Sequence, residues 1–185
     1  MRFYLSSVMS FFLLFAKPCI AQPGPLTASE IMREAMQTAV KQDKNVFIIF
    51  DASWCGWCRK MDTAINDNTC KDFFYKNYVI RHIDVDEPRD RKYLENPGGD
   101  ELRKQYHGDG EGIPFWLIFD KDGKLLADSQ MRPEGADHDS KGENTGCPAT
   151  EKEVAYFIAI LKKTSQITEA EQTAVEKRFR ENENN

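Results

Sequence analysis

Two cysteines three positions apart are the residues of this chain best suited to chemistry. Cys55 and Cys58 enclose Gly56 and Trp57, and the pair closely follows the apolar run 46–50. A thiolate can attack a disulfide, and a second thiol one helical turn away can then displace the mixed disulfide that forms. The spacing therefore indicates thiol–disulfide exchange, with Cys55 as the attacking thiol and Cys58 as the resolving thiol.

The residues on either side predict how the pair is held. A short apolar run rich in β-branched and aromatic residues is typical of a buried central strand, and apolar residues recur at helical spacing from Cys58 to Ile65. The first turn of a helix offers unpaired N–H groups and the positive end of the helix dipole, which lower the pKa of a thiol from about 8.5 to between about 3.5 and 7.5. Arg59 and Lys60 add positive charge beside the pair. We therefore expect Cys55 to be a reactive thiolate near neutral pH.

Two other kinds of site also use the Cys-x-x-Cys spacing. A zinc site needs two more ligands, but Cys70 and Cys147 stand alone and the three histidines show no ligand spacing. Attachment of a c-type haem needs histidine directly after the second cysteine, where this chain has Arg59. We therefore expect neither a metal nor another cofactor.

The rest of the chain predicts alternating helices and strands. Helices are expected over 28–43, 58–65 and 73–78, in short patches at 93–94 and 102–106, and from 154 onwards; strands are expected over 46–50, 79–85, 115–119 and 124–128. Residues 132–149 have few apolar side chains, which is typical of a long surface loop. This order joins crossover connections to one antiparallel hairpin and predicts an α/β three-layer sandwich with a mixed central sheet.

The residues around the cysteines resemble the thioredoxin family. The segment Phe50-x-Ala52-x-Trp54-Cys55-Gly56-Trp57-Cys58-Arg59-Lys60-Met61 is followed about 55 residues later by Gly112-Ile113-Pro114. The resemblance extends roughly over 28–164 and is closest to exported, single-domain thioredoxin-like proteins. It implies the thioredoxin fold, here with an extra C-terminal helix.

The resemblance also implies where a substrate binds. In this family the Ile113–Pro114 bond is expected to be cis and to face the cysteines, and the backbone of Ile113 pairs with the substrate strand. Trp54 and Trp57 are expected to be partly exposed and to form an apolar rim suited to peptide-like substrates. We therefore expect the substrate to contact Trp54, Gly56, Trp57, Ile113 and Pro114.

Two positions depart from the family pattern. Thioredoxins carry a buried aspartate six residues before the first cysteine, which handles the proton of the resolving thiol, and this chain has Ile49 there. Asp51 is close by, but we expect it on the opposite face of the strand, so the Cys58 proton must use water or another carboxylate. The second departure is Trp57 in place of the usual proline, and this dipeptide tunes the reduction potential.

The N-terminus predicts export. Arg2 precedes an apolar run over 3–16, and the small-x-small sequence at 19–21 is typical of a signal-peptide cleavage site. The run is shorter than the ~20 residues that span a bilayer, so we expect no membrane span after cleavage. The predicted organisation is a signal peptide over 1–21, a thioredoxin-like domain over 22–164 and a charged C-terminal helix over 165–185.

Charge and compartment limit the class of function. Cleavage after Ala21 leaves 23 basic and 30 acidic residues, a balance that does not favour nucleic acid. We expect a secreted or periplasmic thiol–disulfide oxidoreductase of the reductase or isomerase type. Its partners would be protein or peptide disulfides and a redox protein that recycles the cysteine pair. The alternative is a binding module of the same fold in which the two cysteines form only a static disulfide.

The two remaining cysteines of the mature chain are not expected to pair. Cys70 lies twelve residues beyond Cys58, up to about 18 Å along a helix, whereas Cys147 directly precedes the final helix of the family fold, near the active-site end. A disulfide needs Cα atoms within ~7 Å. We predict that Cys70 is a buried or half-buried structural thiol and that Cys147 lies nearer the catalytic pair.

Overall fold

A four-stranded mixed sheet forms the centre of the protein. The computed structural model describes residues 24–133, 135–137 and 140–184. The strand order is β2-β1-β3-β4. β1 (Asn45–Asp51) pairs in parallel with β2 (Tyr78–Asp84) and antiparallel with β3 (Phe115–Phe119), and β4 (Leu125–Asp128) pairs antiparallel with β3. The predicted crossover and hairpin are both confirmed.

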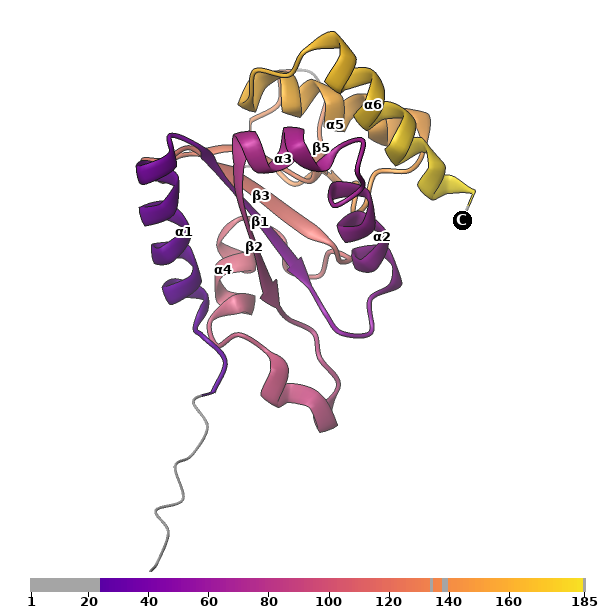
Figure 1. Ribbon diagram of the computed structural model, residues 1–185. Coiled ribbons are helices and arrows are strands. Elements are labelled where there is room, and N and C mark those ends of the chain that lie inside the picture. The colour runs from indigo at the N-terminus through magenta and orange to yellow at the C-terminus, as the bar shows by residue number, and fades with distance from the viewer. Residues whose placement is uncertain (1–23, 134, 138–139, 185) are drawn as a thin grey trace, which may run out of the picture.

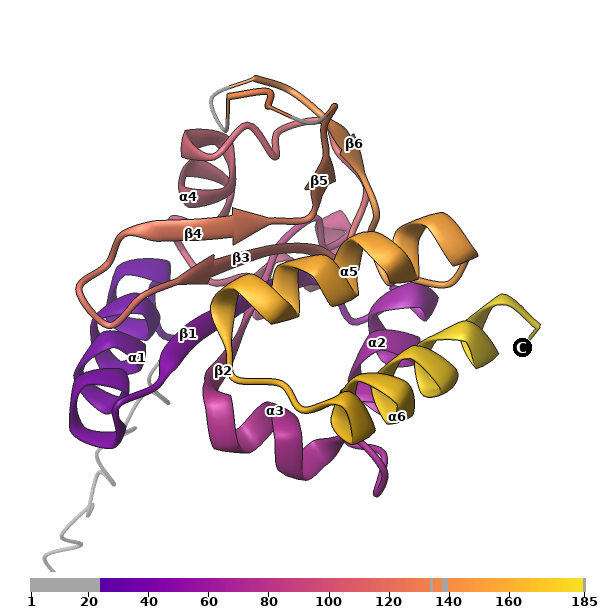
Figure 2. The same cartoon turned by 90° about the horizontal axis from the view of Figure 1, so that it is seen from above.

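Helices cover both faces of this sheet (Figures 1 and 2). One face packs against α1 (Ala28–Gln42) and α4 (Gly99–Gln105), and the other against α2 (Gly56–Ile65), α3 (Lys71–Asn77), α5 (Glu151–Thr164) and α6 (Glu169–Arg180). Two short 3-10 helices, η1 (Arg89–Leu94) and η2 (Glu181–Glu183), follow β2 and α6. This arrangement confirms the expected α/β three-layer sandwich with an additional C-terminal helix.

Alternation along β1 builds a core on each side. Phe47 and Ile49 face α2, α3, α5 and α6, whereas Val46, Ile48 and Phe50 face α1. On the first side Phe157 of α5 contacts Phe179 of α6, with ring centroids 4.9 Å apart. The C-terminal helix therefore shares the core of the sheet.

The segment 132–149 differs from the expected surface loop. Part of it forms β6 (Glu143–Asn144), which pairs with β5 (Gln130–Met131), and Thr145 and Cys147 are buried. The backbone N–H and the hydroxyl of Thr145 both donate to the carbonyl of Ser129, at 2.8 and 3.0 Å. Hydrophobic patterning did not predict the hydrogen bonds of Thr145, because they are polar contacts between distant residues.

The predicted signal peptide over 1–21 lies outside the described residues. Within the part of the chain that the structure describes, every helix is too short or too polar to span a bilayer.

Candidate active site

Cys55 and Cys58 form a disulfide at the start of α2. Cys55 is the N-cap residue of that helix, and its Sγ accepts a hydrogen bond from the backbone N–H of Cys58 at 3.0 Å. Both residues are buried and pack against Ala52 and Ile113. The strand β1 and the helix α2 thus place the pair where a developing thiolate would meet a helix N-terminus.

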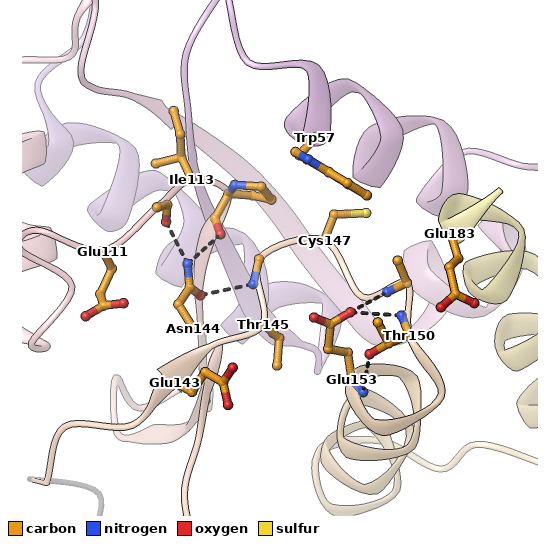
Figure 3. Close-up of a pocket in the computed structure, with 14 residues that line it drawn as sticks. Trp57, Glu111, Ile113, Glu143, Asn144, Thr145, Cys147, Thr150, Glu153 and Glu183 are labelled. Carbon is orange, nitrogen blue, oxygen red and sulfur yellow. Dashed lines mark hydrogen bonds between the residues drawn. The ribbon is translucent and has the colours of Figure 1, made fainter. Parts of the chain in front are cut away.

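The Ile113–Pro114 peptide bond is cis, as expected, and lies beside the pair. The carbonyl oxygen of Ile113 is 3.6 Å from Sγ of Cys55. The side-chain amide of Asn144 donates to the carbonyls of Gly112 and Pro114, at 2.6 and 3.3 Å (Figure 3). The small second sheet therefore fixes the loop that faces the cysteines. Nothing in the sequence pattern singled out Asn144, because a lone amide carries no periodic signal.

The two tryptophans around the cysteines are partly exposed, as expected, at 50% for Trp54 and 46% for Trp57. The indole N–H of Trp54 donates to the carbonyl of Asp86 at 2.9 Å, which fixes that ring. The ammonium of Lys60 lies 3.8 Å from the ring centroid of Trp57, close enough for a cation–π interaction. Part of the positive charge expected beside the thiols is thus directed at an aromatic ring.

A cavity of about 490 Å³ is lined by Trp57 from between the two cysteines, but not by Cys55 or Cys58. Its lining includes Trp57, Ile113 and Pro114 together with Asn144, Cys147 and Glu183, and Figure 3 shows Trp57 across from the loop that carries Cys147. The structure therefore brings three of the five expected substrate-binding residues together around one hollow. Trp54 and Gly56 are not among its lining residues.

The two other described cysteines are free and buried. Burial raises the pKa of the Cys70 thiol, and burial raises that of Cys147 to about 12. The side-chain amide of Asn182, itself buried, donates to Sγ of Cys147 and to the carbonyl of Pro148, both at 3.3 Å. Both thiols are unpaired in this structure, and Cys147 lines the cavity that Trp57 and Ile113 also line. The role of Asn182 was not anticipated.

A chain of charged side chains lies between the sheet and α2. Oδ2 of Asp51 is 2.6 Å from Nδ1 of His82, and Nε2 of His82 is 3.3 Å from Oδ1 of Asp62. Burial alone would lower the pKa of His82, but its hydrogen bonds to Asp51 and Asp62 and their charges raise it to about 10. The imidazole is therefore positively charged at neutral pH.

The structure corrects the expected orientation of Asp51. Its contact with His82, which also reaches α2, places it on the face that Ile49 shares. The physical reason is strand alternation, since residues two positions apart point to the same face. The expectation that Asp51 faces away from Ile49 was wrong, and carboxylates do lie on the side of the sheet that carries the cysteine pair.

Metal binding has no evident site in this part of the chain. Among the described residues no group of three or more histidine, cysteine, aspartate or glutamate side chains is arranged to hold a metal ion.

Comparison with solved structures gives several thioredoxin-like proteins. The disulphide isomerase of Xylella fastidiosa Temecula1 is 20% identical, with 64% of this chain and 80% of that chain covered and a TM-score of 0.46. The oxidoreductase DsbH is 24% identical over 83% and 95% of the two chains, with a TM-score of 0.42. The oxidised C-terminal domain of DsbD from Neisseria meningitidis is 20% identical over 76% and 98%, with a TM-score of 0.43.

Comparison with family models assigns the chain more directly. No curated protein matches the sequence. The thioredoxin-like family model, however, matches residues 28–121, more than half of the chain, and that stretch carries β1, the Cys55–Cys58 disulfide and the cis bond before Pro114. The protein therefore belongs to the thioredoxin-like family.

Proposed function

We propose that this protein is an extracytoplasmic thiol–disulfide oxidoreductase that acts on protein or peptide disulfides by dithiol exchange. The observation that carries the proposal is the Cys55–Cys58 disulfide, because Cys55 is the N-cap residue of α2 and its Sγ lies 3.6 Å from the carbonyl oxygen of Ile113, next to the cis bond. A helix N-terminus stabilises the thiolate on which disulfide exchange depends, and a purely structural cross-link does not need it.

The reaction follows from the order of the two thiols. In the reduced protein the Cys55 thiolate attacks one sulfur of a substrate disulfide, a Cys55–substrate bond forms, and the other substrate sulfur leaves as a thiolate. The Cys58 sulfur then attacks Sγ of Cys55, the internal disulfide forms, and the substrate is released fully reduced. The reverse sequence oxidises a substrate dithiol. The same residues thus support reductase, oxidase or isomerase chemistry, and the recycling partner sets the direction.

The proposed substrate site is the cavity and its rim. An extended peptide would lie along Ile113 and Pro114, with Trp57 and Trp54 providing apolar contact and Gly56 allowing close approach to the pair. Two further parts of the proposal rest on sequence alone. The signal peptide over 1–21 would direct the chain out of the cytoplasm, and 22–164 would form the catalytic domain with 165–185 as its C-terminal helix.

Enzymatic turnover tests the proposal. The reduced protein should reduce a polypeptide disulfide such as insulin in the presence of dithiothreitol. Cys55→Ser should abolish this activity, and Cys58→Ser should accumulate mixed disulfides that survive non-reducing electrophoresis. Cys70→Ser serves as the matched control, since that thiol is buried and outside the cavity. A reduction potential below about −300 mV with no turnover would instead support the binding module with a static disulfide.

A further inference from the structure

The charged side chains between β1, β2 and α2 form a connected cluster that dithiol exchange as described leaves unused. His82 lies between Asp51 and Asp62 and is in contact with both. In the strand register Asp84 of β2 lies opposite Asp51 of β1. Glu87, which is buried, accepts hydrogen bonds from the backbone N–H and the hydroxyl of Ser53. Four carboxylates and one imidazolium thus meet near the carboxyl ends of two neighbouring strands.

One oxygen in this cluster lacks a partner. Oδ1 of Asp51 is buried and has no hydrogen bond within the described part of the chain, whereas Oδ2 is held by His82. A buried carboxylate oxygen without a donor costs about 1–3 kcal/mol or more, so such an atom is retained only against a penalty. Two carboxylates can share a hydrogen bond only when one of them carries a proton. The arrangement of Asp51 opposite Asp84 is therefore suited to holding one proton between the two carboxylates.

The cluster lies next to the redox pair. Asp51 is four residues before Cys55, and the intervening Ala52 packs against both cysteines. On α2, Asp62 follows Cys58 by four residues, so their side chains occupy neighbouring positions on the same side of the helix. Asp62 therefore lies within about one helical turn of the resolving thiol, and its contact with His82 connects it to Asp51.

We propose that Asp51 accepts the proton of Cys58 when this thiol resolves the mixed disulfide. Asp84 shares this proton with Asp51, and His82 and Asp62 position the Asp51 carboxylate. The inference rests on the proposed function. The Cys58 S–H bond breaks and its proton passes through one water molecule to Asp51, while the sulfur electron pair forms the bond to Sγ of Cys55. The bond between Cys55 and the substrate sulfur breaks, and the substrate thiolate takes a proton from solvent. In the reverse reaction the cluster returns its proton to the Cys58 thiolate.

The protonation states of the cluster agree with this role. Burial, followed by the charges of Asp51 and Glu87, raises the pKa of Asp84 to about 6. Burial opposes the charged form of His82, but hydrogen bonds to Asp51 and Asp62 raise its pKa to about 10, so the imidazole stays cationic beside Asp51. The Asp84 carboxyl, which lies opposite Asp51 in the strand register, thus gains and loses a proton close to neutrality, where an acid–base group is most effective.

A reaction with two separable steps tests the proposal. The reduced protein, without residues 1–21 and therefore without Cys19, is mixed with one equivalent of 5,5′-dithiobis(2-nitrobenzoate), and the coloured thiolate is followed by stopped flow. Attack by Cys55 releases the first thiolate at a rate proportional to reagent concentration. Resolution by Cys58 releases the second at a rate independent of that concentration. The second phase therefore reports on the Cys58 proton alone.

We expect Asp51→Asn to slow the second phase at least about tenfold at pH 7, because general-base assistance contributes about 10²–10⁴-fold. The first phase should change by less than about threefold. In the wild type the second phase should accelerate as the pH rises through about 6 and then level off. In Asp51→Asn and Asp84→Asn it should keep rising towards the ionisation of an unassisted thiol near about pH 8.5. Asp51→Glu, which keeps the carboxylate, should retain the inflection.

The control is Asp72→Asn, which removes an exposed carboxylate from the nearby α3 and should alter neither phase. A second phase in Asp51→Asn that equals the wild type in rate and pH profile would overturn the inference. A wild-type second phase without an inflection near pH 6 would also overturn it, even if the variants fail to fold. If the wild type releases only one thiolate, dithiol exchange itself is contradicted, and the proposed function falls first.

Discussion

Cys55 and Cys70 both occupy the N-cap position of a helix, yet their surroundings differ. Sγ of Cys55 accepts a hydrogen bond from the backbone of α2, whereas Cys70 makes no side-chain cap with α3. Sγ of Cys70 lies 3.4 Å from the hydroxyl of Thr69 within an aromatic core, and burial raises its pKa. A helix N-terminus alone therefore does not make a cysteine reactive. The side chain must also point at the free N–H groups and at space that a substrate can enter.

Cys147 extends this comparison to a thiol beside the same cavity. It lines the hollow that Trp57 and Ile113 also line, but it does not cap a helix, since the N-cap residue of α5 is Thr150. The side-chain amide of Asn182 donates to its sulfur, but burial raises its pKa to about 12. Burial thus leaves Cys147 with a very small fraction of thiolate.

The largest expected difference is the rate of alkylation. At pH 7 a thiol with a pKa of about 12 is ionised in only about one molecule in 10⁵. In the reduced protein, iodoacetamide should therefore modify Cys55 at least about 10³-fold faster than Cys70 or Cys147. Peptide mapping by mass spectrometry at a series of times measures these rates.

Unfolding provides the control for that measurement. In guanidinium chloride the alkylation rates of Cys55, Cys58, Cys70 and Cys147 should converge, because the differences between them arise from the folded structure. Fast modification of Cys147 in the native protein would contradict the expected difference in reactivity between Cys55 and Cys147. Faster modification of Cys58 than of Cys55 would reverse the roles assigned to these two thiols.

Local patterns predicted the elements that hold the pair, because the information is local. Three local features predicted the layers of the fold and the position of the site. They are the apolar run that becomes β1, the helical spacing after Cys58 and the resemblance around Ile113–Pro114. The face of Asp51 was misjudged although strand alternation suffices to assign it. The cluster around His82 had one local signal, the spacing of four between Cys58 and Asp62.

Contacts between distant segments could not be predicted in this way. Asn182 reaches Cys147 across 35 residues, and Asn144 reaches Gly112 across 32. Each depends on where a helix or a short strand ends relative to a loop elsewhere, and an isolated asparagine gives no periodic signal. The C-terminal helix was predicted as a charged helix, but its contribution to the core and to the cavity was not predicted.

An intermediate effect is expected from Asn182→Ala, which tests what keeps Cys147 unreactive. The change removes donors to Sγ of Cys147 and to the carbonyl of Pro148, and an acceptor for Arg178. Leaving such groups unsatisfied should lower the free energy of unfolding by about 1–3 kcal/mol, measured by urea denaturation. Loss of the donor alone would disfavour the Cys147 thiolate, but truncation of the buried Asn182 side chain opens space beside this sulfur, so alkylation of Cys147 should become faster relative to Cys70. Asn184→Ala, at an exposed position two residues on, is the matched control and should change neither quantity.

The smallest expected effect is on the pH dependence of the free energy of unfolding. It tests whether charge distinguishes the surroundings of the redox pair from the apolar surroundings of Cys70. Burial opposes the charged form of His82, but Asp51 and Asp62 raise its pKa in the folded state to about 10, against about 6.5 in the unfolded chain. The stabilisation is complete below about pH 6.5 and is lost as the pH rises to about 10. Since the side chain is 37% exposed, solvent limits the loss to about 1 kcal/mol or less.

Asp84 gives the opposite sign in a different pH window. Its pKa is raised to about 6, chiefly by burial, so ionisation of this carboxyl destabilises the fold as the pH rises from about 4 to 6. Urea denaturation at a series of pH values measures both effects. As the pH rises above 6.5, the wild type should lose stability relative to His82→Gln. As the pH rises from about 4 to 6, the wild type should lose stability relative to Asp84→Asn. A Cys70→Ala variant should follow the wild-type pH dependence up to about pH 8. If His82→Gln runs parallel to wild type throughout, the imidazole is not held as a cation, and the contrast between the two cysteine surroundings rests on burial alone.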